Sequence, residues 1–182
     1  MEGRKKGEAE IESMDDIVKL VGILDKAIVM ERNAVKFYRR AADYVPSEAG
    51  KKILLWLSDF EKGHVKRLED RRTRLIEESG IPASKFPPTQ FETELSETTG
   101  SQEIGPEMSE GDIIMVAVAN EERGYDYYQR KLSHIPEGPG RDLFETLMKE
   151  EKRHINILID QRKHLEVNRI WGNFDEIVKG FK

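Results

Sequence analysis

The chain contains no cysteine. Without thiolates it cannot form disulfides, iron–sulfur clusters or cysteine-ligated zinc sites, and it has no cysteine nucleophile. Any metal ion that it binds must therefore be held by nitrogen and oxygen ligands.

Long apolar runs are also missing. No stretch approaches the roughly 18 consecutive apolar residues of a membrane-spanning helix. The N-terminal residues MEGRKKGEAEIES carry charges but lack the apolar segment of a secretory signal. We therefore expect no membrane association and a cytoplasmic location.

A concentrated patch of positive charge is the third absence. The 30 Lys and Arg residues are interleaved with 35 Asp and Glu residues, and the net charge is −5. This pattern argues against a nucleic-acid partner. A length of 182 residues suits one sizeable core, so we expect a single domain over residues 1–182.

Helical periodicity is what the sequence does contain. Apolar residues at three- and four-residue spacing predict an all-α fold with two helix hairpins, 14–79 and 110–167. Ser13 and Ser109 are each followed three residues later by Asp, a capping-box pattern that predicts where each hairpin begins. We expect a Pro-, Ser- and Gly-rich crossover over 80–109 and a short amphipathic helical tail over 168–182.

The length of the crossover bears on the arrangement of the helices. Fully extended, a connection of this length reaches about 90 Å, whereas a long helix spans about 40 Å. The second and third helices can therefore run parallel in an up-down-down-up four-helix bundle. The sequence leaves open whether the hairpins exchange between two chains, and it leaves the role of the crossover open.

The two hairpins are an internal repeat with an offset of 90 residues, which relates Glu31 to Glu121 without a gap. A shared helical spacing would explain the matched leucines. It would not explain the matched polar and aromatic pairs, which are Tyr38 and Tyr128, Glu61 and Glu151, and His64 and His154.

These polar residues fall on core positions. Glu61 and His64 continue the apolar stripe of Leu54, Leu57 and Leu68, and their counterparts do the same in the second hairpin. An unpaired buried carboxylate costs several kcal/mol, so four of them require cations. Two divalent ions would balance the charge, and we predict six metal ligands: Glu31, Glu61, His64, Glu121, Glu151 and His154. In the alternative, the histidines are ordinary core or boundary residues and the glutamates turn outward under a shifted helix register.

The segments AIVMERNAVKFYRRAA and DFEKGHVKRL, with VAVANEERGYDYYQRKL and KEEKRHINIL, resemble rubrerythrin-type members of the ferritin-like superfamily. The resemblance covers Met14 to about Leu165. It implies a ferritin-like four-helix bundle that holds two iron ions and reduces hydrogen peroxide or dioxygen, often as a homodimer. It also implies that Glu61 and Glu151, from the two Glu-x-x-His pairs, lie between the ions.

Two departures from the family matter. Rubrerythrins carry a Cys-rich rubredoxin-like domain that delivers electrons, whereas this chain has no cysteine, so we expect an external electron-donor protein. Rubrerythrins also tend to have one more carboxylate a turn beyond the third-helix Glu, where this chain has Gly124, with Ala34 as its counterpart. We expect these small residues to leave room for a small molecule above the metal ions.

We therefore expect a non-haem di-iron oxidoreductase, with manganese possible in place of iron. Tyr38 and Tyr128 lie two turns beyond Glu31 and Glu121 and are candidate catalytic residues; the alternative is an ordinary role in the core. The sequence also leaves open an iron-oxidising or iron-storage protein, a manganese catalase-like enzyme and a metal-free structural bundle.

Overall fold

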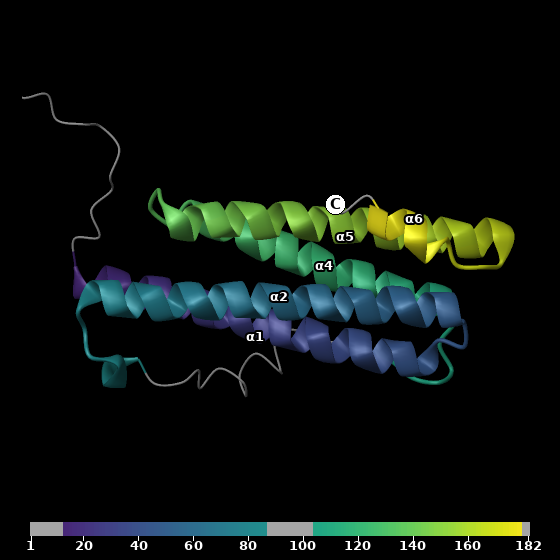
Figure 1. Ribbon diagram of the computed structural model, residues 1–182, viewed down its shortest axis with the longest axis horizontal. Coiled ribbons are helices and arrows are strands. Elements are labelled where there is room, and N and C mark those ends of the chain that lie inside the picture. The colour runs from purple at the N-terminus through teal and green to yellow at the C-terminus, as the bar shows by residue number, and fades with distance from the viewer. Residues whose placement is uncertain (1–12, 87–103, 180–182) are drawn as a thin grey trace, which may run out of the picture.

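The computed structural model describes residues 13–86 and 104–179. These residues form helices and connecting turns and contain no strand, which confirms the expected all-α fold (Figure 1). The elements are α1 (Met14–Tyr44), α2 (Glu48–Ser79), the 3₁₀ turn η1 (Ala83–Lys85), α4 (Glu110–Leu132), α5 (Pro139–Asn168) and α6 (Phe174–Lys179). Most of the expected crossover and the end of the tail lie outside the described residues.

Both predicted capping signals begin a helix. Ser13 caps α1, where its side-chain oxygen accepts a hydrogen bond from the backbone nitrogen of Asp16. Ser109 and Asp112 form a complete capping box at the start of α4. At the other end of the first hairpin, α2 stops at Gly80, whose φ of 66° lies in the left-handed region that glycine adopts readily. The hairpins therefore begin and end where local sequence chemistry favours it.

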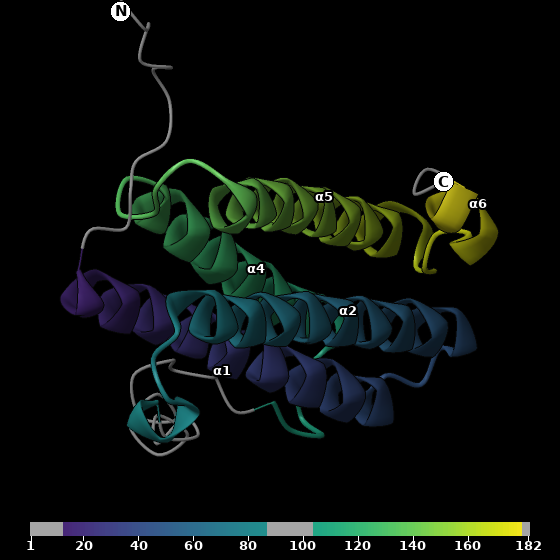
Figure 2. The same cartoon turned by 60° about the vertical axis from the view of Figure 1, so that its left-hand side comes forward.

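The four long helices form a bundle made of two antiparallel hairpins. Helix α1 packs mainly on α2, and α4 packs mainly on α5 (Figure 1). Between the hairpins, α1 contacts α4 and α2 contacts α5. Figure 2 shows the hairpins as two layers.

The helix directions require a long crossover. The hydroxyl of Tyr38 bonds to Glu121 and that of Tyr128 bonds to Glu31, so α1 and α4 run antiparallel. Helix α4 begins beside the α1–α2 turn, where the backbone nitrogen of Ser47 donates to a carboxylate oxygen of Glu110. Helix α2 ends at the opposite end of the bundle, so the end of α2 and the start of α4 lie at opposite ends (Figure 1).

The core consists of two apolar clusters with a polar belt between them. One cluster includes Leu54 and Leu57, and the other includes Leu68 and Leu75. Between them, α2 buries Ser58, Glu61 and His64. The opposite faces of the long helices are charged and exposed. Accordingly, no helix within 13–86 and 104–179 has the apolar length required to cross a membrane.

The segment after α5 docks on the first hairpin. Trp171 is only 4% exposed and packs against Gly50 and Val45. The backbone nitrogen of Gly172 donates a 2.7 Å hydrogen bond to the side-chain oxygen of Gln161, which fixes the turn after α5. The absence of a side chain at Gly50 makes space for the indole ring.

We predict that Gly50→Ala destabilises the protein. An added Cβ would lie 2.5 Å from Cε2 of Trp171 and 2.7 Å from Cγ1 of Val45, so the indole must shift. Overpacking of this kind costs about 1–3 kcal/mol of unfolding free energy. Urea unfolding monitored by tryptophan fluorescence measures the loss of stability. The emission of the folded variant should also shift to longer wavelength, because the displaced indole is more exposed to water.

Gly63→Ala on the same helix is the matched control. Nothing lies within 4 Å of a Cβ added at Gly63, so the helix should gain about 0.5–1 kcal/mol. Equal effects of the two substitutions would contradict the docking of Trp171 on Gly50.

Candidate metal centre

The structure brings the six predicted ligands together in the polar belt at the middle of the bundle. Each is at most 3% exposed. Because all four glutamates point inward, the alternative of a shifted helix register is wrong. Each helix of a hairpin contributes, with Glu31 from α1, Glu61 and His64 from α2, Glu121 from α4, and Glu151 and His154 from α5.

The ligands form two overlapping groups that share Glu61 and Glu151. Within each group, one nitrogen or oxygen from every residue lies within 4.8 Å of the others. The groups are Glu31, Glu61, His64 and Glu151, and Glu61, Glu121, Glu151 and His154. The shared residues are the two glutamates expected to bridge, so the arrangement suits a pair of ions joined by two carboxylates.

The imidazole nitrogens that face the carboxylates show why a cation fits here. Nδ1 of His64 lies 3.0 Å from Glu61, 3.1 Å from Glu151 and 3.6 Å from Glu31. Nδ1 of His154 lies 3.1 Å from both Glu61 and Glu121 and 3.7 Å from Glu151. One N–H group cannot serve three acceptors well, whereas a metal ion can bind all of them.

Unsatisfied oxygens give the same indication. Among the described residues, both carboxylate oxygens of Glu61 and Oε1 of Glu151 are buried and receive no hydrogen bond. Buried polar atoms without partners are rare and costly, and a site for an ion is a common explanation. The donor set therefore fits two hard or borderline divalent ions.

Tyr38 and Tyr128 cross between the hairpins to hold the outer carboxylates. The Tyr38 hydroxyl donates to Oε1 of Glu121, and the Tyr128 hydroxyl donates to Oε1 of Glu31. Burial raises the pKa of both phenols well above its usual value, and nearby carboxylates raise it further. The hydroxyls therefore stay protonated and act as donors. The structure places both tyrosines against ligand carboxylates, and a catalytic role for them stays a prediction.

Burial, together with repulsion between carboxylates, raises the proton affinity of Glu31 and Glu151. Burial and the carboxylate of Glu61 raise the pKa of Glu31 to about 8, and similar causes raise the pKa of Glu151 well above its usual range. Burial alone would lower the pKa of His64 and His154, but the surrounding carboxylates raise it. In the absence of metal, protons offset the carboxylate charge, so metal binding should release protons.

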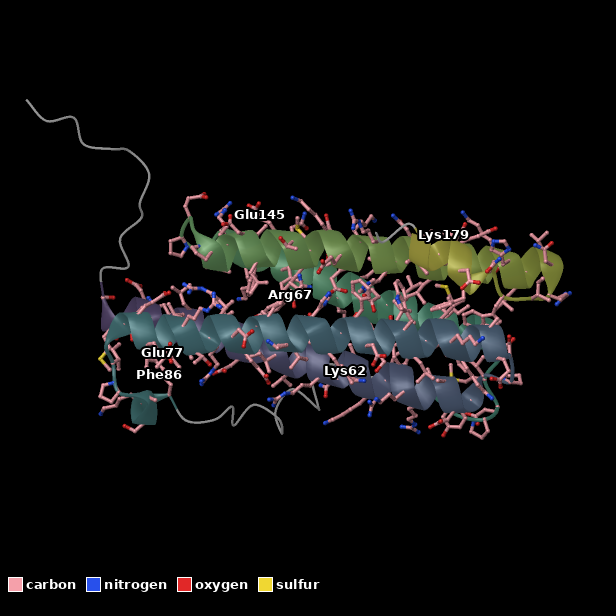
Figure 3. All side chains as sticks on the ribbon, in the orientation of Figure 1. Lys62, Arg67, Glu77, Phe86, Glu145 and Lys179 are labelled. Carbon is pink, nitrogen blue, oxygen red and sulfur yellow. The ribbon has the colours of Figure 1, made fainter. Side chains whose placement is uncertain are left out.

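Glu150 and Arg67 form an outer layer that the sequence analysis missed. Oε2 of Glu150 lies 3.2 Å from Nε2 of His64. Both terminal guanidinium nitrogens of Arg67 bond to the Glu150 carboxylate, and Figure 3 shows Arg67 between α2 and α5. Burial would raise the pKa of Glu150, but His64 and Arg67 lower it to about 2. The sequence contains one indication of this contact: the 90-residue repeat is broken at Glu150, whose counterpart is Phe60.

A cavity of about 240 Å³ opens onto the carboxylates between α1 and α4. Ala34 and Gly124, the small residues expected to leave room above the ions, both line it. At Gly124 an added Cβ would lie 3.4 Å from Cδ of Glu151, so the helix backbone approaches this ligand closely. Phe37 and Tyr127 supply aromatic surface. The centre can therefore be reached from this side of the bundle.

Comparison with known proteins supports the fold alone. The chain matches no protein-family model and no curated protein. It is similar to the solved structure of a hypothetical protein from Pyrococcus furiosus, with a TM-score of 0.58 and 23% sequence identity. The match covers 85% of this chain and 94% of that one.

We predict that the metal-free protein loses stability as the pH rises from about 4.5 to about 8. Glu31 has an ordinary pKa of 4.5, which the folded protein raises to about 8. Between these values the folded protein holds a proton that the unfolded chain has released, and this stabilisation disappears as the pH passes through the folded-state pKa. Urea unfolding in the presence of a chelator, repeated at several pH values, measures the slope of the unfolding free energy against pH.

Glu31→Gln should reduce this pH dependence because it removes one of the groups whose pKa the fold raises. Glu122→Gln is the matched control, since Glu122 is exposed beside the ligand Glu121 and should leave the slope unchanged. A wild-type stability that rises with pH over this interval would contradict the interpretation.

Proposed function

We propose that this protein is a rubrerythrin-type, ferritin-like di-iron oxidoreductase that reduces hydrogen peroxide or dioxygen. The observation that carries the proposal is the pair of overlapping ligand groups that share Glu61 and Glu151. The resemblance of the ligand-bearing segments to rubrerythrins supports it. An external electron-donor protein, a homodimer and a cytoplasmic location belong to the same proposal.

A bound pair of iron ions would supply the two electrons that reduction of hydrogen peroxide to water requires. The chain's own residues provide the setting for that chemistry. Four carboxylates balance the charge of the ions, and two imidazoles complete the ligand set. Tyr38 and Tyr128 restrain the outer carboxylates, Glu121 and Glu31, by hydrogen bonds. Such outer partners fix ligand orientation and basicity.

The arrangement gives the centre an open and a packed side. The cavity between α1 and α4 reaches the four glutamates, and the histidines are not among the residues that line it. On the histidine side, the Phe60 ring lies 5.3 Å from the His154 ring and 6.4 Å from the His64 ring, measured between centroids. A small substrate should therefore approach from the α1–α4 side.

Metal content is the first test. Protein purified without chelator should carry about two Fe or Mn ions per chain by elemental analysis. The double variant Glu61→Ala, His64→Ala should lose them. A second double variant, Glu122→Ala, His134→Ala, removes an exposed Glu and an exposed His and should retain them.

The metal-loaded protein should then consume peroxide only when a reductant is added. Oxygen evolution from peroxide without reductant would favour a manganese catalase-like enzyme instead. Accumulation of hundreds of iron ions per soluble assembly would favour storage. Absence of metal from the wild type after Fe(II) loading, with the protein folded, would overturn the proposal and leave a structural bundle.

We predict that Ala34→Leu impairs access to the centre without removing metal. Ala34 lines the cavity, and a larger side chain there would narrow it. We expect kcat/KM for a bulky alkyl hydroperoxide to fall by about tenfold, equivalent to about 1.4 kcal/mol of transition-state stabilisation, with a smaller loss for hydrogen peroxide.

Ala119→Leu is the matched control for access. It makes the same change at a half-buried position of α4 that is not among the residues lining the cavity, so it should leave kcat/KM for both peroxides close to the wild-type values. Equal losses for both peroxides in the Ala34→Leu protein would contradict access from this side.

A further inference from the structure

The contacts of Glu150 and Arg67 distinguish one half of the repeat from the other. Under the 90-residue offset, Glu150 corresponds to Phe60 and Arg67 corresponds to Ile157. A carboxylate and a guanidinium group in one half are thus replaced by two uncharged apolar side chains in the other. The predicted ligands, in contrast, are the same in both halves.

The orientation of His64 places its two nitrogens in different surroundings. Nδ1 faces the ligand carboxylates, with Glu61 at 3.0 Å and Glu151 at 3.1 Å. Nε2 faces outward from the centre, with Oε2 of Glu150 at 3.2 Å. When Nδ1 binds a metal ion, the proton of the neutral imidazole must reside on Nε2. That proton then lies on the nitrogen 3.2 Å from Oε2 of Glu150, a close approach without the alignment of a hydrogen bond.

Arg67 holds Glu150 in this position. Its Nη1 lies 3.4 Å from Oε1 of Glu150, and its Nη2 bonds to Oε2. The Glu150 side chain is 19% exposed and that of Arg67 is 38% exposed. Bidentate pairs between Arg and a carboxylate fix geometry as well as charge. Since Arg67 lies three residues after His64 on α2 and Glu150 lies on α5, the contacts also join the two helices.

We infer that Glu150, held by Arg67, is a positioning residue for the metal ion bound at His64, an inference that rests on the proposed metal centre. The carboxylate fixes the orientation of the imidazole and increases its basicity, which strengthens its bond to the ion. The effect should be larger at this position than at His154, because the close approach of Glu150 is to Nε2 of His64.

Co(II) binding to two single-histidine variants tests the inference. His154→Ala retains the position at His64, and His64→Ala retains the position at His154. Glu150→Gln is added to each, and Co(II) is titrated while the visible absorption bands of the bound ion are recorded. In the His154→Ala protein, Glu150→Gln should raise the Kd by about 10- to 100-fold and shift the absorption bands. In the His64→Ala protein, the change should stay below about twofold.

Two controls separate positioning from general effects. Glu122→Gln removes an exposed negative charge adjacent to Glu121 and should leave both Kd values unchanged. Arg67→Met keeps the Glu150 carboxylate but removes its clamp, so it should weaken Co(II) binding in the His154→Ala protein only. Urea unfolding of each metal-free variant shows whether a loss of affinity follows from a loss of fold.

The outcomes separate the inference from the proposed function. Equal weakening in both backgrounds, or weakening in neither, would overturn the role of Glu150 while leaving the metal centre intact. Absence of Co(II) binding by the wild type would overturn the metal centre itself. If a single-histidine variant binds no ion, Co(II) is titrated into the protein that keeps both histidines. Two ions should then bind in two steps, and Glu150→Gln should weaken only one of these steps.

Discussion

Repulsion among four buried carboxylates is the constraint on which the rest of the structure depends. Glu31, Glu61, Glu121 and Glu151 occupy the polar belt between two apolar clusters, where desolvation penalises each negative charge. The two histidines, the two tyrosine hydroxyls and bound protons compensate only in part. The two proposed metal ions would supply the missing positive charge. Metal binding would then link the stability of the bundle to its proposed function.

The repeated hairpin explains the near-symmetry of the centre, and its exceptions explain how the two sides differ. Tyr38 and Tyr128 hold the carboxylate of the opposite hairpin in equivalent ways. On the open side, Ala34 and Gly124 are both small. On the packed side, Glu150 faces His64. The repeated scaffold thus has a cavity on one side of the carboxylates and different surroundings for its two histidines.

Much of the architecture followed from local sequence patterns. The 3.6-residue periodicity predicted the long helices, and the capping residues Ser13 and Ser109 predicted where each hairpin begins. Polar residues at core positions within an in-register repeat predicted which six side chains meet. The choice of Glu61 and Glu151 as shared residues followed from the family resemblance. These features depend on neighbouring positions of one helix or on a constant sequence offset, so the sequence by itself determined them.

Only the tertiary structure decided which residues meet across helices. The bonds from Tyr38 to Glu121 and from Tyr128 to Glu31 depend on how the two hairpins align. The approach of Glu150 to His64, the cavity between α1 and α4, and the packing of Trp171 on Gly50 also depend on the register and spacing of separate helices. Helical periodicity fixes the face on which a side chain lies, but the neighbour opposite that face depends on packing of the whole bundle.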